Sequence, residues 1–235
     1  MSELWPNGPE YEGGGVFPIT TDSVLLADFV RLRPGLRVFE PCSGAGLISL
    51  LLLAREPRLD VYALELDGAA CEAARRNFAA NGFRADVVCG DLRDAANLPA
   101  ANSCGLAVCN PPYFPAGSGR TAPDGRRALA RSEGGCTLAD VVRAAARTLC
   151  QGGRFALVHR AERLAELFAA LAAEKLEPKR LRFVQHRAQG APGLVLCEAV
   201  RLGRPGLTVE PPLVLYGEDG RESAEFRRIY HLGGN

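Results

Sequence analysis

The chain has 235 residues, of which 47% are hydrophobic and 23% are charged, so it has the composition of an ordinary globular protein and not of a disordered one. Its 28 Lys and Arg residues nearly balance its 27 Asp and Glu residues. With a net charge of +1 the chain has no overall attraction to nucleic acid, which would have to be bound through local basic patches.

Residues 1–35 are predicted to form an irregular N-terminal arm and then a helix over 23–31, with Asp22 as its N-cap. From Leu36 onward, short apolar runs alternate with helical patterns. The predicted strands are 36–39, 60–64, 85–89, 106–109 and 155–159, and the predicted helices are 46–54, 67–80, 138–149 and 162–175. This alternation predicts an α/β fold with parallel strands joined by right-handed crossovers. Two last strand-like runs, 180–185 and 194–202, have only a turn between them, which predicts an antiparallel pair at the end of the sheet.

A glycine-containing turn joins the first of these strands to its helix. Glu40 ends the strand, and Gly44 and Gly46 lead into the helix. Small residues let the backbone approach a ligand closely, and the start of a helix presents N–H groups without partners. Such a turn therefore predicts a ligand-binding loop, and tight packing of strand against helix is the alternative explanation.

Acidic residues follow the next two strands. Glu65 comes about 20 residues after the glycines, where a carboxylate accepts both ribose hydroxyls of an adenosine cofactor. Asp91, after the third strand, is placed to accept a hydrogen bond from the exocyclic amine of the cofactor's adenine. Each of them could instead be a solvated loop acid.

The fourth strand ends in Asn110-Pro111-Pro112-Tyr113. Two prolines form a rigid corner and leave backbone carbonyls without local partners. The Asn110 side-chain oxygen and the Pro111 carbonyl can then both accept hydrogen bonds from one planar NH₂ group, and Tyr113 offers a flat face for stacking. A plain proline-rich turn would not explain why this tetrapeptide ends the fourth strand of this pattern.

With this motif in place, the chain resembles the class I S-adenosylmethionine-dependent methyltransferases that modify planar amines. More closely it is similar to the bacterial tRNA1(Val) adenine-N6 methyltransferase family. The stretches that carry the similarity are 21–30, 109–114, 153–160, the tail 203–216, and Ile229-Tyr230. The resemblance implies a Rossmann-like fold with a mostly parallel seven-stranded sheet, an antiparallel C-terminal strand and helices on both faces. It also implies that residues 1–35 close over the cofactor and that 36–235 form the methyltransferase domain.

The resemblance assigns roles to the motif residues. It implies S-adenosylmethionine as cofactor, with the catalytic residues Asn110, Pro111, Pro112 and Tyr113. The cofactor-binding residues that it implies are Asp22, Glu40, Ser43, Gly44, Gly46, Glu65, Leu66, Asp91, Leu92 and Asn110. Oxygens of Asn110 and Pro111 would accept hydrogen bonds from the two amine N–H groups and favour a pyramidal nitrogen, and the methylated nitrogen would lose a proton to water without a general base. The implied substrate is the N6 amine of an adenine in the anticodon-loop region of a tRNA.

Several alternatives stay open. The acceptor could be adenine in rRNA or DNA, or a glutamine side-chain amide of a protein, since the same motif serves any planar amine. A dehydrogenase would also use a Gly-rich turn and a ribose-binding acid, but Gly44-Ala45-Gly46-Leu47-Ile48-Ser49 lacks its third glycine or alanine, and the Asn-Pro-Pro-Tyr motif would have no role. A binding module without catalysis would not need the intact motif.

Two basic segments are candidates for contact with RNA phosphates. The weak substrate-contact candidates are Phe114, Arg120, Arg126, Arg127 and Arg131 after the motif, and Lys179, Arg180 and Arg182 later in the chain. A solvated charged face is the alternative for both. Two departures from the family fall at Cys42, where relatives have a glycine, and at Ser132, where relatives often have a histidine.

The eight cysteines include no C-x-x-C pair, and the chain has only three histidines, so no metal site is expected. Most of these cysteines lie in apolar context, which indicates buried thiols in a reducing compartment. The longest apolar run, 47–54, is too short to span a bilayer, and residues 1–10 lack the basic start and apolar stretch of a secretory signal. We therefore expect a cytoplasmic protein with no membrane contact; the sequence does not indicate its oligomeric state.

Overall fold

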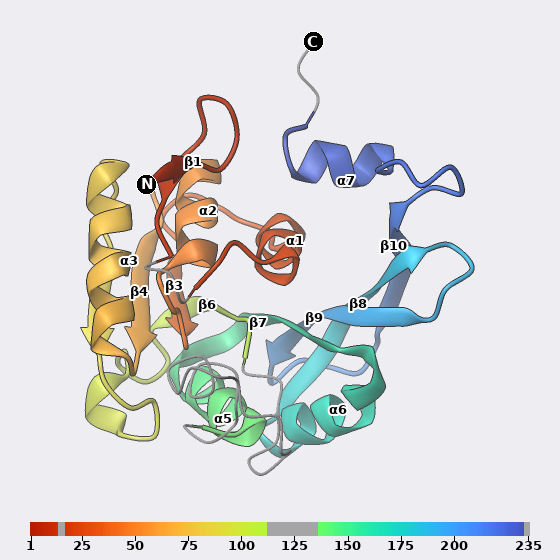
Figure 1. Ribbon diagram of the computed structural model, residues 1–235. Coiled ribbons are helices and arrows are strands. Elements are labelled where there is room, and N and C mark those ends of the chain that lie inside the picture. The colour runs from red at the N-terminus through yellow and green to blue at the C-terminus, as the bar shows by residue number, and fades with distance from the viewer. Residues whose placement is uncertain (14–16, 112–135, 233–235) are drawn as a thin grey trace, which may run out of the picture.

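The computed structural model of the chain describes residues 1–13, 17–111 and 136–232, and every structural statement below concerns these residues (Figure 1). Within them, eight strands form one sheet in the order β10-β8-β9-β7-β6-β3-β4-β5. The strands are β3 (Arg37–Pro41), β4 (Asp60–Glu65), β5 (Asp86–Cys89), β6 (Cys104–Cys109), β7 (Leu149–Arg160), β8 (Leu176–Arg187), β9 (Pro192–Arg201) and β10 (Thr208–Tyr216). A separate antiparallel pair, β1 (Ser2–Glu3) and β2 (Glu10–Tyr11), lies near the N-terminus.

The sheet is mostly parallel. β3 pairs with β4 and β6, β4 with β5, and β6 with β7, all in parallel. β9 is antiparallel to both β7 and β8, and β10 returns parallel to β8. The expected α/β fold with an antiparallel strand near the C-terminus is therefore confirmed, with eight strands in place of the expected seven.

The additional strand is β10, which the sequence does not reveal because Pro211 and Pro212 interrupt it. Proline cannot donate to a ladder, so it is tolerated chiefly on edge strands. β10 is such an edge strand, and its pairing with β8 shifts register between Glu210 and Leu213, across the two prolines.

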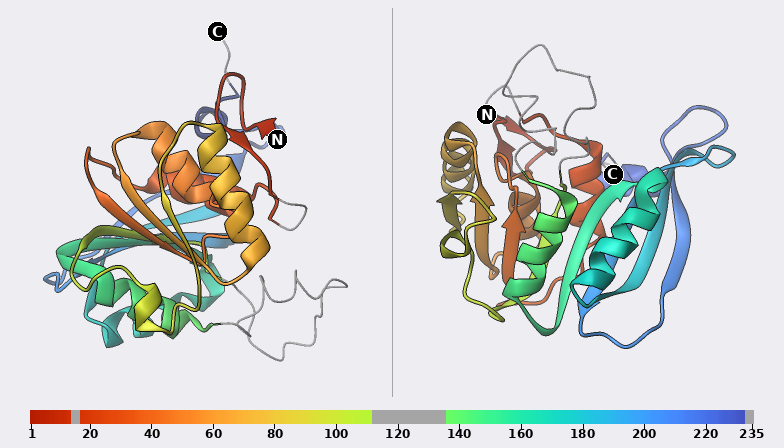
Figure 2. Two further views of the ribbon diagram at one scale, coloured as in Figure 1. Left: turned by 90° about the vertical axis from the view of Figure 1, so that its left-hand side faces the viewer. Right: turned by 90° about the horizontal axis from the view of Figure 1, so that it is seen from below.

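Helices cover both faces of the sheet (Figure 2). They are α1 (Thr21–Phe29), α2 (Leu47–Arg55), α3 (Gly68–Ala80), α5 (Leu138–Thr148), α6 (Leu164–Ala173) and α7 (Ala224–Ile229), with short 3₁₀ turns η1 (Ala95–Asn97) and η2 (Ala161–Arg163). α1, α2, α3 and α7 share one apolar cluster with one face of the sheet, and α5 and α6 share a second cluster with the other. No helix in the described part of the chain is both long and apolar enough to cross a membrane.

α1 begins earlier than the sequence predicts, and its cap differs. Thr20 is the N-cap, and its hydroxyl accepts a hydrogen bond from the backbone N–H of Ser23 at 3.4 Å. The prediction of Asp22 as N-cap is wrong because Thr20 supplies the capping oxygen. Asp22 lies instead in the first helical turn, where its negative charge interacts favourably with the positive end of the helix dipole.

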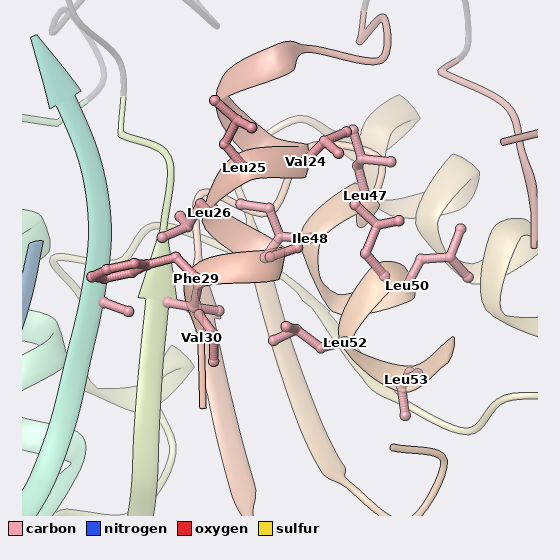
Figure 3. Close-up of a cluster of buried hydrophobic side chains, with 14 of the residues drawn as sticks. Val24, Leu25, Leu26, Phe29, Val30, Leu47, Ile48, Leu50, Leu52 and Leu53 are labelled. Carbon is pink, nitrogen blue, oxygen red and sulfur yellow. The ribbon is translucent and has the colours of Figure 1, made fainter. Parts of the chain in front are cut away.

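α1 is packed into the domain through its apolar side chains (Figure 3). Leu25, Leu26 and Phe29 lie in the same buried cluster as Ile48 and Leu52 of α2. α2 is apolar nearly all round, which is typical of a helix that is buried on more than one side. This packing fixes the N-terminal end of α1 relative to the ends of the strands.

Candidate active site

Predicted cofactor and catalytic residues within the described part of the chain meet at the carboxyl edge of the parallel strands. β3 lies between β4 and β6, so the chain proceeds from β3 to one side through β4 and β5 and continues on the other side with β6. The carboxyl ends of strands at such a reversal form the crevice in which open α/β sheets bind ligands. The turns after β3, β4, β5 and β6 all end at this edge, and each carries one predicted group.

The turn after β3 requires glycine for two reasons. Gly44 has φ = 54° and Gly46 has φ = 79°, a left-handed conformation that favours glycine. A Cβ at Gly44 would lie 2.8 Å from the ring of Phe17, so any side chain there would collide with the N-terminal arm. Cys42, which stands where the family resemblance predicts a glycine, also has a positive φ of 57°.

Ser43, between these positions, has a buried hydroxyl with no hydrogen-bond partner within the described residues. A buried polar atom without a partner costs free energy, so it points to a missing ligand or water. The contact between Ser43 and a cofactor stays a prediction.

Glu40 is 1% exposed at the end of β3. Its carboxylate accepts hydrogen bonds from the backbone N–H of Ser49 at 3.0 Å and from the Ser49 hydroxyl. Burial raises the pKa of Glu40 to about 8, the nearby Glu65 adds to the increase, and the two bonds from Ser49 oppose it. A cation bound near Glu40 would favour its ionised form.

Glu65, at the end of β4, holds the cofactor loop in place. Its Oε2 accepts from the backbone N–H of Gly44 at 2.8 Å, and its Oε1 accepts from the N–H groups of Leu66 and Asp67 at 2.8 and 3.0 Å. Carboxylate oxygens have further acceptor sites, so hydroxyl groups of a ligand can still donate to them. Leu66 is exposed beside this carboxylate.

Asp91, after β5, forms an ion pair with Arg93, whose Nε lies 2.9 Å from Asp91 Oδ1. Hydrogen bonds from Arg93 lower the pKa of Asp91 below its usual value, so this carboxyl is ionised at neutral pH. Leu92 next to it is buried. Contact of these two residues with an adenine ring stays a prediction.

Asn110 follows β6 and is held by α1. Its Nδ2 donates to the hydroxyl of Ser23 at 3.1 Å, and Ser23 is 7% exposed. The Thr20 hydroxyl lies 2.9 Å from the same Ser23 oxygen. Pro111 is buried beside Asn110. Ser23 and Thr20 are site residues that the sequence does not reveal, because no local pattern connects them to a residue 87 positions away.

Other predicted residues lie outside the described residues or interact with groups beyond the four turns. The predictions for Pro112, Tyr113, Phe114, Arg120, Arg126, Arg127, Arg131 and Ser132 fall outside the described residues. Asp22 lies in the first turn of α1. Burial raises the pKa of the Tyr230 hydroxyl, and the negative charge of Asp22 adds to the increase. Arg182 pairs with Glu225 through two bonds of 2.8 and 2.7 Å.

Three thiols lie at the same edge. Cys42 Sγ is 3.7 Å from Cys136 Sγ, and Cys109 Sγ donates to the carbonyl of Pro41 at 3.2 Å. Burial raises the pKa of the Cys109 thiol, so it is protonated at neutral pH. Nowhere in 1–13, 17–111 or 136–232 do three or more His, Cys, Asp or Glu side chains form a group that could hold a metal ion.

These residues fit S-adenosylmethionine. The cofactor carries an ammonium and a sulfonium group, and the site holds the carboxyl groups of Glu40 and Glu65 at the ends of adjacent strands. The hydroxyl of Ser43 is buried without a partner in the described structure, and Gly44 presents backbone with no side chain. These are the features that a polar, cationic ligand lying against a loop would use.

Comparison with known proteins gives a consistent result. A model of the methyltransferase small domain matches residues 18–177. A tRNA1(Val) (adenine(37)-N6)-methyltransferase of Porphyromonas gingivalis is 33% identical over 230 residues, which cover 92% of this chain and 88% of that protein. A protein of the same name from Tolumonas auensis is 33% identical over 211 residues, covering 88% of this chain and 86% of its own.

Among solved structures, a predicted O-methyltransferase from Agrobacterium tumefaciens superposes with a TM-score of 0.74 and 21% identity, covering 90% of this chain and 96% of that one. At this identity the similarity supports the fold alone, which is the Rossmann-like fold that the sequence predicts. The agreement of the family model with relatives over nearly the whole length establishes the membership. The chain belongs to the methyltransferase small domain family, and within it to the family of the bacterial tRNA1(Val) (adenine(37)-N6)-methyltransferases.

Proposed function

We propose that this protein transfers a methyl group from S-adenosylmethionine to the N6 amine of an adenine in tRNA, and that it does so in the cytoplasm. The observation that carries this proposal is the position of Asn110, which follows β6 beside the cofactor loop and whose Nδ2 donates to Ser23. Because an amide nitrogen only donates, Oδ1 is the atom of Asn110 that can accept a hydrogen bond from a substrate amine.

The chain's own groups support this chemistry at the carboxyl edge of the sheet. The cofactor, when bound, supplies an electrophilic methyl group on its sulfonium. Asn110 Oδ1 and the Pro111 carbonyl would each accept a hydrogen bond from one N6–H, which draws the nitrogen lone pair out of conjugation with the ring. These two acceptors would also stabilise the positive charge that develops on the nitrogen. The methylated nitrogen would then lose one proton to water. Holding the amine in line with the sulfur–methyl bond lowers the barrier by roughly 7–11 kcal/mol in favourable cases.

Binding of the cofactor is proposed to use the residues of the four turns. Glu40, Ser43, Gly44 and Gly46 would contact its methionine end, Glu65 and Leu66 its ribose, and Asp91 and Leu92 its adenine. Asp22 and the N-terminal arm would close over it, and Phe17 already lies against Gly44. The arm (1–35) and the methyltransferase domain (36–235) therefore form the cofactor site together in this proposal.

The names of the relatives support tRNA as the substrate class. An adenine in an anticodon loop is unpaired, so it can be splayed into a pocket at lower cost than a base within a stem. Membership of a methyltransferase family removes the dehydrogenase alternative.

A labelling experiment tests the proposal. The purified protein is incubated with methyl-labelled S-adenosylmethionine and unmodified total tRNA, and the RNA is digested to nucleosides. We expect label in N6-methyladenosine, a loss of at least about 100-fold in kcat for Asn110→Ala, and partial activity for Asn110→Asp, which keeps an acceptor oxygen.

Parallel reactions with total protein, with ribosomal RNA and with DNA test the remaining acceptors. Label that enters only glutamine of proteins, only rRNA or only DNA would contradict the tRNA assignment. Full activity of Asn110→Ala would contradict the role of Asn110. Arg84→Gln, an exposed residue before β5, is the control and should retain wild-type activity.

A further inference from the structure

A basic pocket lies outside the candidate active site. It has a volume of about 310 Å³ and is lined by residues that follow α1 and by residues of β7, β8, β9 and β10, which are neighbours in the sheet. Its charged lining residues are Arg31, Arg154, Lys179, Arg180, Glu198 and Glu210. The proposed methyl transfer uses none of them.

The pocket lies within reach of a nucleic acid that is bound at Asn110. Arg154 pairs with Leu106, which precedes Asn110 by four positions on β6, or roughly 13 Å of extended strand. Ser23 lies six positions before the end of α1 at Phe29, or roughly 9 Å of helix, and Arg31 follows two residues later. Since Ser23 contacts Asn110, α1 connects the two sites directly.

Arg180 is a structural part of the pocket wall. Its Nε lies 2.7 Å from Glu210 Oε1, and its guanidinium lies 3.4 Å from Glu198 Oε2 and 4.0 Å above the ring of Phe29. The side chains of Arg180 and Glu198 are 12% and 4% exposed. The charge of Arg180 is therefore compensated within the protein, and this arginine is not the group that attracts a ligand.

The remaining cations of the pocket have no carboxylate partner within the described residues. Lys179 Nζ donates to the carbonyl of Arg204 at 3.0 Å, which satisfies a donor without neutralising the ammonium. Arg31 and Arg154 are exposed, and neither forms an ion pair within the described residues. Four cations and two carboxylates leave the pocket with a net charge of +2, in a chain whose total is +1.

We propose that this pocket is a phosphate-binding subsite that holds the backbone of the substrate RNA while the target base occupies the active site. This inference rests on the proposed function. Guanidinium groups bind phosphate oxygens in a bidentate manner. Arg31 and Arg154 line the pocket and are exposed, so a phosphate group can reach both of them from solvent. Glu198 and Glu210 disfavour a small free anion, whereas a polyanion that is also held at the active site gains from a high effective concentration.

The test compares Arg31→Gln/Arg154→Gln with wild type and with the control Arg84→Gln. Binding of unmodified tRNA is measured by fluorescence anisotropy over a series of KCl concentrations, in the presence of S-adenosylhomocysteine. We expect the double variant to bind tRNA roughly 10-fold more weakly at low salt. Its plot of log K against log salt should be less steep by about one unit for each phosphate that the variant no longer neutralises. Because both arginines are exposed, the thermal midpoint and the kcat at saturating tRNA should match wild type.

An unchanged salt slope in the double variant would overturn the proposal. A second measurement, titration with inorganic phosphate and with AMP, separates the two sources of phosphate. Loss of phosphate or AMP binding in the double variant with an unchanged tRNA slope would overturn the assignment to RNA. If wild type methylates no tRNA but the slope still falls in the double variant, the proposed function fails and the RNA subsite stands.

Discussion

Asn110 Nδ2 donates to Ser23 Oγ at 3.1 Å, and this bond joins the end of β6 to the first turn of α1. The bond orients the Asn110 amide, because its nitrogen can donate to Ser23 and its oxygen cannot. The Thr20 hydroxyl lies 2.9 Å from the same Ser23 oxygen. The N-terminal helix is thus part of the site, although it precedes Asn110 by most of a domain in sequence.

Ser23→Ala should therefore reduce catalysis more than binding. Without the hydroxyl, the Asn110 amide loses a partner that orients it. We expect kcat to fall about 10-fold, which corresponds to about 1.4 kcal/mol, with little change in the affinity for S-adenosylhomocysteine. Ser23→Thr keeps the hydroxyl and should recover most of the activity. Ser103→Ala, near the other end of β6, is the control, and a wild-type kcat for Ser23→Ala would refute this role.

The buried carboxyl of Glu40 should make stability depend on pH in an unusual direction. Its pKa is raised from 4.5 to about 8 on folding, so the folded state binds more protons between these values than the unfolded state. This contribution to stability is complete below pH 4.5 and is lost as the pH rises through 8. The loss amounts to about 1.4 kcal/mol for each pH unit between the two pKa values.

Urea unfolding of wild type and Glu40→Gln at pH 6, 7 and 8 measures this contribution. We expect the free energy of unfolding of wild type to decrease with pH relative to that of Glu40→Gln, which has no carboxyl to titrate. Parallel curves for the two proteins would show that Glu40 is already ionised at pH 6.

Gly44→Ala should abolish cofactor binding, whereas Gly82→Ala should not. Both glycines have a positive φ, 54° and 69°, so both substitutions cost about 1 kcal/mol of backbone strain. Only the Cβ at Gly44 would meet another group, the ring of Phe17 at 2.8 Å, while nothing in the described structure lies within 4 Å of a Cβ at Gly82. Calorimetric titration with S-adenosylhomocysteine distinguishes the two variants, and equal affinities would contradict the proposed cofactor loop.

Arg182 and Glu225 should stabilise the packing of α7 against the sheet. Their two bonds, of 2.8 and 2.7 Å, join β8 to α7, and the side chains are 17% and 40% exposed. In a double-mutant cycle with Arg182→Gln and Glu225→Gln, we expect a coupling energy of about 1 kcal/mol in thermal unfolding. The salt dependence of tRNA binding reports separately on Arg182. A less steep slope in Arg182→Gln, with no coupling in stability, would favour the RNA contact that the sequence suggests.

The sequence predicts the part of this molecule that depends on local patterns. The alternation of strands and helices predicts the parallel sheet, and the residues that end β3, β4, β5 and β6 meet at one edge because parallel strands all point the same way. Glu65 illustrates the limit of this reasoning. The motif predicts a ribose ligand for it, and only the structure reveals that it also holds the N–H of Gly44.

What the sequence does not predict depends on contacts between distant segments. The hydrogen bond between Ser23 and Asn110 and the ion pair between Arg182 and Glu225 have no local signal. The cluster of basic residues around Arg180 illustrates the same limit. Its charge is visible in the sequence, but the pairing of Arg180 with Glu210 and Glu198 follows from the neighbouring strands of the sheet.

Residues of α7 and just beyond it contact the N-terminal part of the chain. In the described structure Arg228 holds Asp28 of α1 through two bonds of 3.0 Å. Beyond α7, the ring of His231 stacks on that of Trp5, with centroids 4.1 Å apart. Since Trp5 is the one tryptophan of the chain, all tryptophan fluorescence of the protein comes from this contact. The intensity of that emission therefore indicates whether the rings of Trp5 and His231 are stacked.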